Sequence, residues 1–142
     1  MKNDKELARM IKAQMKLEKE QAEKLRTLEQ RVDSVAAKLL LHEMQLDTKK
    51  HAEILGEILK VIDSPKSFWD YSIHIDADKR AVKMELGEHI KAEETMLHQI
   101  EEEAKRTSDE ALKLLLDHFA EDEKKHHKYL KTILSKTYKM EL

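Results

Sequence analysis

The sequence predicts an all-α protein of four long helices, and three observations lead to this class. The 142-residue chain contains only two Gly and one Pro, so few of its residues favour turns. Charged residues make up 39 % of the chain, which is typical of long solvated helices. Apolar residues recur at helical spacing over most of its length. Because this length suffices for one sizeable core, we predict a single domain over 1–142.

The first and second helices are predicted over residues 4–31 and 34–62, with Asn3 and Asp33 as their N-caps. The tight link between them makes the two helices antiparallel neighbours. The apolar stripe of the first helix passes through Glu18 and consists of Leu7, Ile11, Ala22, Leu25 and Val32.

The segment 63–77 is predicted to be a long crossover between the second and third helices. Ser64-Pro65 ends the second helix, and the residues that follow alternate between apolar and polar, as in an extended and half-buried segment. Fifteen extended residues reach roughly 50 Å, while a helix of about 28 residues is about 42 Å long. The segment can therefore run the length of a helix. Its apolar residues are Trp69, Tyr71, Ile73 and Ile75.

The third and fourth helices are predicted over residues 79–106 and 109–138, with Asp78 and Ser108 as their N-caps. The stripe of the third helix passes through Glu93 and consists of Val82, Leu86, Ile90, Leu97, Ile100 and Ala104. The stripe of the fourth passes through Glu123 and His126 and consists of Leu112, Leu115, Leu116, Phe119, Leu130, Ile133 and Leu134.

The two halves of the chain, about 3–62 and 78–138, form a repeat with an offset of 75 residues. Under this offset 38–55 aligns with 113–130 without a gap, and half of the aligned positions are identical, where chance in a Lys- and Leu-rich chain gives roughly two. The identical positions are Lys38, Leu39, Leu40, Leu41, Asp47, Lys49, Lys50, His51 and Leu55. The chain is therefore predicted to be two repeated helical hairpins.

The repeat brings out a set of metal-ligating side chains on the apolar stripes. Glu18 aligns with Glu93, and His51 aligns with His126, which follows Glu123 by three residues and so shares its helix face. A buried carboxylate is costly unless it is paired or bound to a metal, and Glu-x-x-His inside a helical bundle is an arrangement that binds metal. The halves differ at one position, since Thr48 stands where the second half has Glu123.

With these residues the chain resembles the rubrerythrin-type diiron-carboxylate branch of the ferritin-like superfamily. The resemblance implies a ferritin-like four-helix bundle with metal ligands Glu18, His51, Glu93, Glu123 and His126. It also implies iron or manganese, and reaction with dioxygen or peroxide or oxidation of Fe(II). The family has a glutamate at the position of Thr48, so one bridging carboxylate is missing. Either another carboxylate replaces it or the site holds one ion; the candidates are Asp47, first among them, Glu43 and Glu53.

Amino-acid composition limits the cofactors and partners that can be expected for this protein. Carboxylate and imidazole ligands suit iron, manganese or zinc. The absence of Cys excludes thiolate metal sites, so an enzyme would need an external electron donor. A net charge of −2 argues against nucleic acid, and no apolar run suggests a membrane span or leader, so we expect a soluble cytoplasmic protein. The wide apolar stripes favour a homodimer.

The sequence allows two other interpretations. The first is a bundle with a degenerate site that serves as an oligomerisation or partner-binding module; it predicts that the five candidate ligands pair with lysines or face solvent. The second, a hemerythrin-like oxygen carrier, is disfavoured because only two histidines occupy matched core positions. Five other histidines lie on or near stripe edges and are expected at the surface or in supporting positions: His42, His89, His98, His118 and His127.

Overall fold

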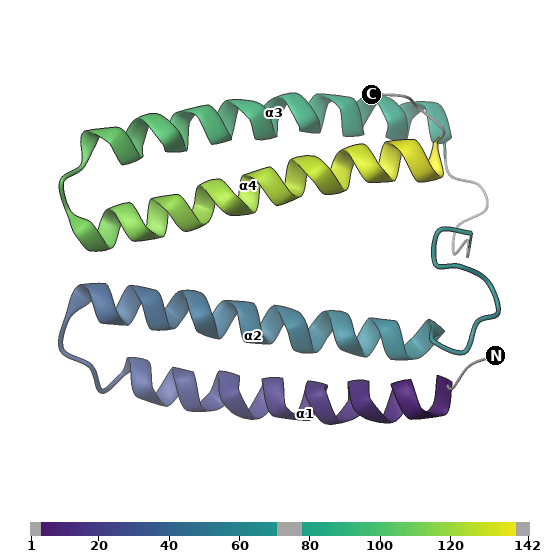
Figure 1. Ribbon diagram of the computed structural model, residues 1–142, viewed down its shortest axis with the longest axis horizontal. Helices are drawn as coiled ribbons and strands as arrows, with labels where there is room; N and C mark the ends of the chain where they lie inside the picture. Colours follow the sequence, from purple (N-terminus) through teal and green to yellow (C-terminus); the bar gives the residue numbers. More distant parts are fainter. Residues whose placement is uncertain (1–3, 71–77, 139–142) are drawn as a thin grey trace. The chain divides into compact units, whose positions relative to one another are not determined.

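The computed structural model describes residues 4–70 and 78–138, and every regular element in these ranges is a helix (Figure 1). The helices are α1 (Asp4–Glu29), α2 (Val35–Val61), α3 (Lys79–Arg106) and α4 (Glu110–Thr137). The predicted all-α class is confirmed, and each predicted helix boundary lies within two residues of the observed one.

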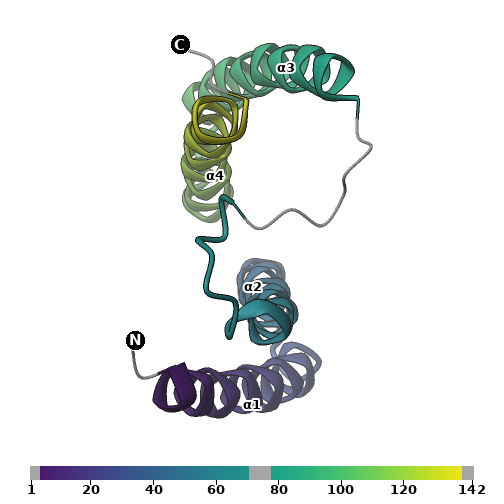
Figure 2. The ribbon, with the colours of Figure 1, turned by 90° about the vertical axis from the view of Figure 1, so that its right-hand side faces the viewer.

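The helices form two hairpins, as predicted. α1 packs antiparallel against α2, and α3 packs antiparallel against α4 (Figures 1 and 2). The chain divides into two compact units at Pro65, one hairpin in each. The packing of both hairpins into one ferritin-like bundle, and the single domain over 1–142, stay predictions.

The N-caps of α2 and α4 are Ser34 and Asp109. Each side chain accepts a hydrogen bond from the backbone N–H three residues further on, at 3.0 Å for Ser34 and 2.8 Å for Asp109. The predicted caps, Asp33 and Ser108, are therefore wrong by one residue. The repeat still holds, because Ser34 and Asp109 are also 75 positions apart.

The segment between α2 and α3 begins with a turn and not with extended chain. The Ser67 carbonyl accepts from the Asp70 N–H at 2.9 Å, and the Ser67 hydroxyl accepts from the Trp69 N–H at 3.2 Å. The extended conformation predicted for Trp69 is therefore wrong, because the serine closes a local turn. At the far end Asp78 caps α3 as predicted, accepting from the Ala81 N–H at 3.1 Å. The predicted cap Asn3 and the alternating residues Tyr71, Ile73 and Ile75 lie outside the described residues.

Small apolar side chains mark the faces by which the helices of each hairpin pack. Ala22 and Ala52 are buried in the first hairpin. The buried apolar residues described in the second hairpin are Ala104, Leu115, Ala120 and Leu134. Alanine at such positions lets two helix backbones approach closely, so longer polar side chains of the same faces can reach across to the facing helix.

Candidate metal centre

Glu93, Glu123 and His126 form a cluster inside the second hairpin. His126 Nδ1 lies 3.4 Å from Glu93 Oε2 and 3.7 Å from Glu123 Oε1. One donor atom from each of the three residues can be chosen so that all lie within 4.8 Å of one another. The sequence predicted these three residues as ligands, Glu123 and His126 from the Glu-x-x-His spacing on an apolar stripe and Glu93 from its place on the stripe of the preceding helix, and the structure brings their side chains together.

Helical spacing explains why these side chains meet. Glu93 precedes the buried Ala104 of α3 by eleven residues, and Glu123 precedes the buried Leu134 of α4 by the same interval. Eleven residues are close to three helical turns, so both carboxylates lie on the faces by which α3 and α4 pack. His126 follows Glu123 by one turn and points the same way.

Burial makes the cluster electrostatically costly in the absence of a cation. The Glu93 side chain is only 7 % exposed, and that of Glu123 only 14 %. Glu123 Oε2 is buried and has no hydrogen-bond partner among the described residues. A buried acceptor without a donor costs roughly 1–3 kcal/mol, and more when it is charged. A cation held between the two carboxylates would remove this cost.

In the first hairpin, Glu18 and His51 form the matching pair. His51 Nδ1 lies 3.0 Å from Glu18 Oε2, and the two residues are 33 positions apart, as are Glu93 and His126. The Glu18 side chain is 17 % exposed. The pairing of these matched residues across each hairpin therefore repeats in the structure.

Thr48, which stands at the position of Glu123, takes no part in this pair. Its hydroxyl donates to the Gln45 carbonyl at 2.9 Å and lies 3.2 Å from the Met44 carbonyl, so it is directed along its own helix. Asp47, a further predicted ligand, lies 3.4 Å from Lys50 Nζ, one turn along α2. The described part of the first hairpin contains no set of three metal-ligating side chains with all donor atoms within 4.8 Å.

Two residues next to the second cluster were predicted only as edge positions. His89 Nε2 lies 3.6 Å from Glu93 Oε1, on the carboxylate oxygen that does not face His126. His127 Nε2 lies 2.9 Å from Glu94 Oε1, a second His–Glu pair beside the first. The sequence carried a signal for both, since His89 is one turn before Glu93 and His127–Glu94 has the same separation of 33 residues.

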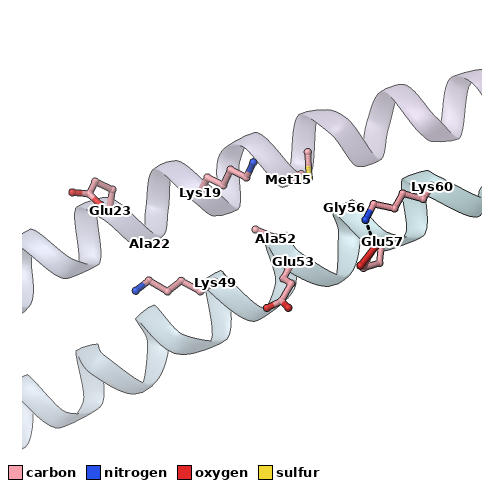
Figure 3. A pocket seen from close by; sticks show the side chains of 10 residues that line it. All are labelled: Met15, Lys19, Ala22, Glu23, Lys49, Ala52, Glu53, Gly56, Glu57 and Lys60. Carbon is pink, nitrogen blue, oxygen red and sulfur yellow. Dashed lines mark ion pairs between the residues drawn. The ribbon is translucent and has the colours of Figure 1, made fainter.

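A groove between α1 and α2 is lined by Glu53, one of the candidate replacements for the missing carboxylate, but by none of the other predicted ligands (Figure 3). Ala22, Ala52 and Gly56 leave the groove hollow because their side chains are small or absent. Charged side chains of both signs surround it, among them Lys60 and Glu57, whose Nζ and Oε2 atoms are 2.8 Å apart. Glu23, Glu53 and Glu57 line the groove, but among the described residues no three metal-ligating side chains there have donor atoms within 4.8 Å of one another.

Comparison of the chain with protein-family models, with curated proteins and with solved structures finds no match in any of the three. The resemblance to rubrerythrin-type proteins therefore rests on the residues quoted above. Within the part of the chain that the structure describes, no helix combines the length and the apolar character that crossing a membrane requires.

Proposed function

We propose that this protein binds a redox-active metal ion, iron or manganese, through Glu93, Glu123 and His126. The observation that carries the proposal is the buried Glu123 Oε2, which has no hydrogen-bond partner in the described structure and belongs to a carboxylate that lies beside His126 and Glu93. Two carboxylates and one imidazole are ligands that Fe(II), Mn(II) and Zn(II) accept. Three protein ligands also leave coordination positions open for a small molecule.

The chemistry that follows is reaction with dioxygen or peroxide, or oxidation of Fe(II). A bound iron or manganese ion would supply the electron transfer, while the protein supplies ligands and a partly dry surrounding. The chain contains no Cys, so it has no thiol to serve as an internal reductant. Sustained turnover would therefore draw electrons from an external donor.

The test is metal analysis after anaerobic loading with Fe(II) and desalting. We expect iron to remain on the wild-type chain and to be lost from Glu123→Ala. Glu121→Ala is the matched control, because Glu121 lies on the same helix but its side chain is 64 % exposed and 3.5 Å from Lys124. Retention of iron by Glu121→Ala but not by Glu123→Ala would support the site, and oxygen consumption on addition of Fe(II) would be measured next. Absence of iron from the wild type would remove the proposal.

The other predicted ligands, Glu18, His51 and Asp47, belong to the first hairpin. The family resemblance implies that they bind two metal ions together with Glu93, Glu123 and His126. This dinuclear site stays a prediction. The amount of iron per chain tests it directly.

One observation favours the alternative function, an interaction module without metal chemistry. Glu18 and His51 satisfy each other at 3.0 Å, as residues of a purely structural hairpin would. If the wild type retains no iron and the Glu123→Ala variant unfolds at the same temperature, the interaction module becomes the better account of the fold.

A further inference from the structure

We infer that each chain binds one metal ion, held by the second hairpin, and that the matched Glu18–His51 pair of the first hairpin is a structural contact that binds none. The inference rests on the proposed function and sharpens it. It departs from the dinuclear site that the family resemblance implies, and it is carried by differences between two halves whose helices otherwise match.

The first difference is the spacing of the donor atoms. His51 and Glu18 are 3.0 Å apart, a normal length for an N–H···O hydrogen bond. In the second hairpin His126 is 3.4 Å from Glu93 and 3.7 Å from Glu123. The donor atoms of the first hairpin therefore lie at normal hydrogen-bond length, whereas both distances in the second hairpin exceed the usual range of about 2.7–3.2 Å, so its contacts are weaker hydrogen bonds.

The second difference is the number of carboxylates. The second hairpin supplies two carboxylates, from Glu93 and Glu123, whereas Glu18 is the one carboxylate beside His51 within the described first-hairpin residues. Thr48 does not replace the missing ligand, because its hydroxyl donates to the Gln45 carbonyl of its own helix. Two protein ligands hold a divalent ion far less tightly than three, and catalytic sites for such ions commonly use three.

The third difference is that a buried carboxylate oxygen in the second hairpin lacks a hydrogen-bond partner among the described residues. Glu123 Oε2 is buried without a partner in the described structure, so the second hairpin gains by binding a cation. The Glu18 oxygen that faces His51 already has its partner. Binding of a cation there would have to break a hydrogen bond of 3.0 Å, whereas the corresponding contact between Glu93 and His126 is longer, at 3.4 Å.

The first experiment is calorimetric titration of the full chain with Co(II), followed by absorption spectroscopy of the bound ion. We expect the wild type to bind about one Co(II) per chain, as a single three-ligand site requires. His126→Ala should lose this binding, with at least a roughly 100-fold weaker affinity, whereas His51→Ala should keep both the stoichiometry and the Co(II) spectrum. Circular dichroism of each variant checks that the helices are retained.

The second experiment restores the missing carboxylate. Thr48→Glu places a glutamate three residues before His51, the arrangement of Glu123 and His126, and should raise the Co(II) stoichiometry to about two. Thr48→Gln has the same size without the charge and should stay near one. Both variants change a residue of the first hairpin and none of the three ligands of the second, so the affinity of the first ion should not change.

The outcomes separate this inference from the proposed function. No Co(II) or Fe(II) binding by the wild type overturns both. Two ions on the wild type, or loss of the ion in His51→Ala, overturns the inference while the proposed function stands. If a Thr48→Glu variant that keeps its helices still binds one Co(II) per chain, the residue at position 48 is not the reason why the first hairpin binds no ion.

Discussion

At the scale of single residues, Glu123 gives the clearest support for the proposed metal site. Its carboxylate lies on the packing face of α4, is 14 % exposed, and has one oxygen without a partner in the described structure. A residue with these properties weakens the fold and is retained when it serves another purpose. Replacement of Glu123 should therefore stabilise the metal-free protein and weaken the binding of metal.

Glu123→Gln is predicted to stabilise the metal-free protein by about 1 kcal/mol, because it removes a buried negative charge beside Glu93. The same change should abolish the rise in melting temperature that excess Mn(II) gives the wild type. Thermal unfolding with and without Mn(II) checks both effects. An equal Mn(II)-induced rise in the variant would show that Glu123 is not a ligand.

A second residue-scale prediction concerns pH. Hydrogen bonds from Arg26 and its positive charge lower the pKa of the Glu23 carboxyl below its ordinary value. This pair therefore stabilises the fold above the ordinary pKa of glutamate, and the effect is lost as the pH falls through the lowered pKa. It is small because both side chains are exposed.

Arg26→Gln should return the pKa of Glu23 toward its ordinary value, as measured by NMR titration of the side-chain carboxyl. Lys24→Gln is the control, since a neighbour at i+1 does not face Glu23 and should leave that pKa where it is. A Glu23 pKa that is the same in wild type and Arg26→Gln would contradict the assignment.

At the scale of the helices, the sequence predicts well which residues are helical but less well which residue caps each helix. Periodic apolar residues located all four helices to within two residues. The caps of α2 and α4 were misplaced because each lies in a pair of cap-forming residues, Asp33-Ser34 and Ser108-Asp109, and local geometry selects the second member. Alternation at 69–75 suggested extended chain, but the hydrogen bonds of Ser67 close a turn over Trp69. Such local contacts do not produce a periodic pattern of apolar residues, so the sequence pattern does not predict them.

Asp109→Ala should destabilise the protein by about 1 kcal/mol, because the Leu112 N–H loses its acceptor at the start of α4. Ser108→Ala, one residue earlier, is predicted to change the free energy of unfolding by less than about 0.5 kcal/mol. Urea unfolding of the two variants checks the assignment of the cap, and a larger loss from Ser108→Ala would reverse it.

The two helical glycines offer stabilising changes. A methyl group at Gly87 would meet nothing within 4 Å, and one at Gly56 would lie 3.6 Å from Met15 Sδ, an ordinary contact distance. Each Gly→Ala change should therefore add roughly 0.5–1 kcal/mol through helix propensity. Thermal unfolding is the measurement, and destabilisation by Gly56→Ala would contradict the expected gain and indicate crowding against Met15.

On the scale of the whole molecule, the internal repeat predicted more than any single motif. It identified Glu93 and His126, and Glu18 and His51, as equivalent pairs, and the structure pairs each across its hairpin. It did not predict the pairing of His127 with Glu94, which has no counterpart in the first half. The spacing of donor atoms also lay beyond prediction, because it depends on how closely two helices approach and on side-chain rotamers.

The predicted homodimer can be tested on α2. Val35, Leu39 and Leu46 lie along one side of this helix and are 75 %, 48 % and 47 % exposed. Position 46 corresponds to a glutamate, Glu121, in α4, so Leu46→Glu introduces a residue that the matching helix already carries. We expect light scattering to give about twice the chain mass for the wild type and a lower mass for Leu46→Glu, because a charge at an apolar contact opposes association.

Glu53→Gln, two turns further along the same side of α2, is the control and should leave the mass unchanged. A wild-type mass equal to one chain would contradict the dimer and leave the exposed stripe to another partner.

The 75-residue repeat also has an evolutionary consequence. Two halves that keep a Glu–His pair at the same separation of 33 residues are most simply descended from one duplicated hairpin. Such an ancestor, too short to bury its apolar stripe alone, would have assembled from identical copies with equivalent sites. Fusion of the copies into one chain would have freed each to change separately, and under the proposal of a single metal site the difference between Thr48 and Glu123 would mark the half that became scaffold.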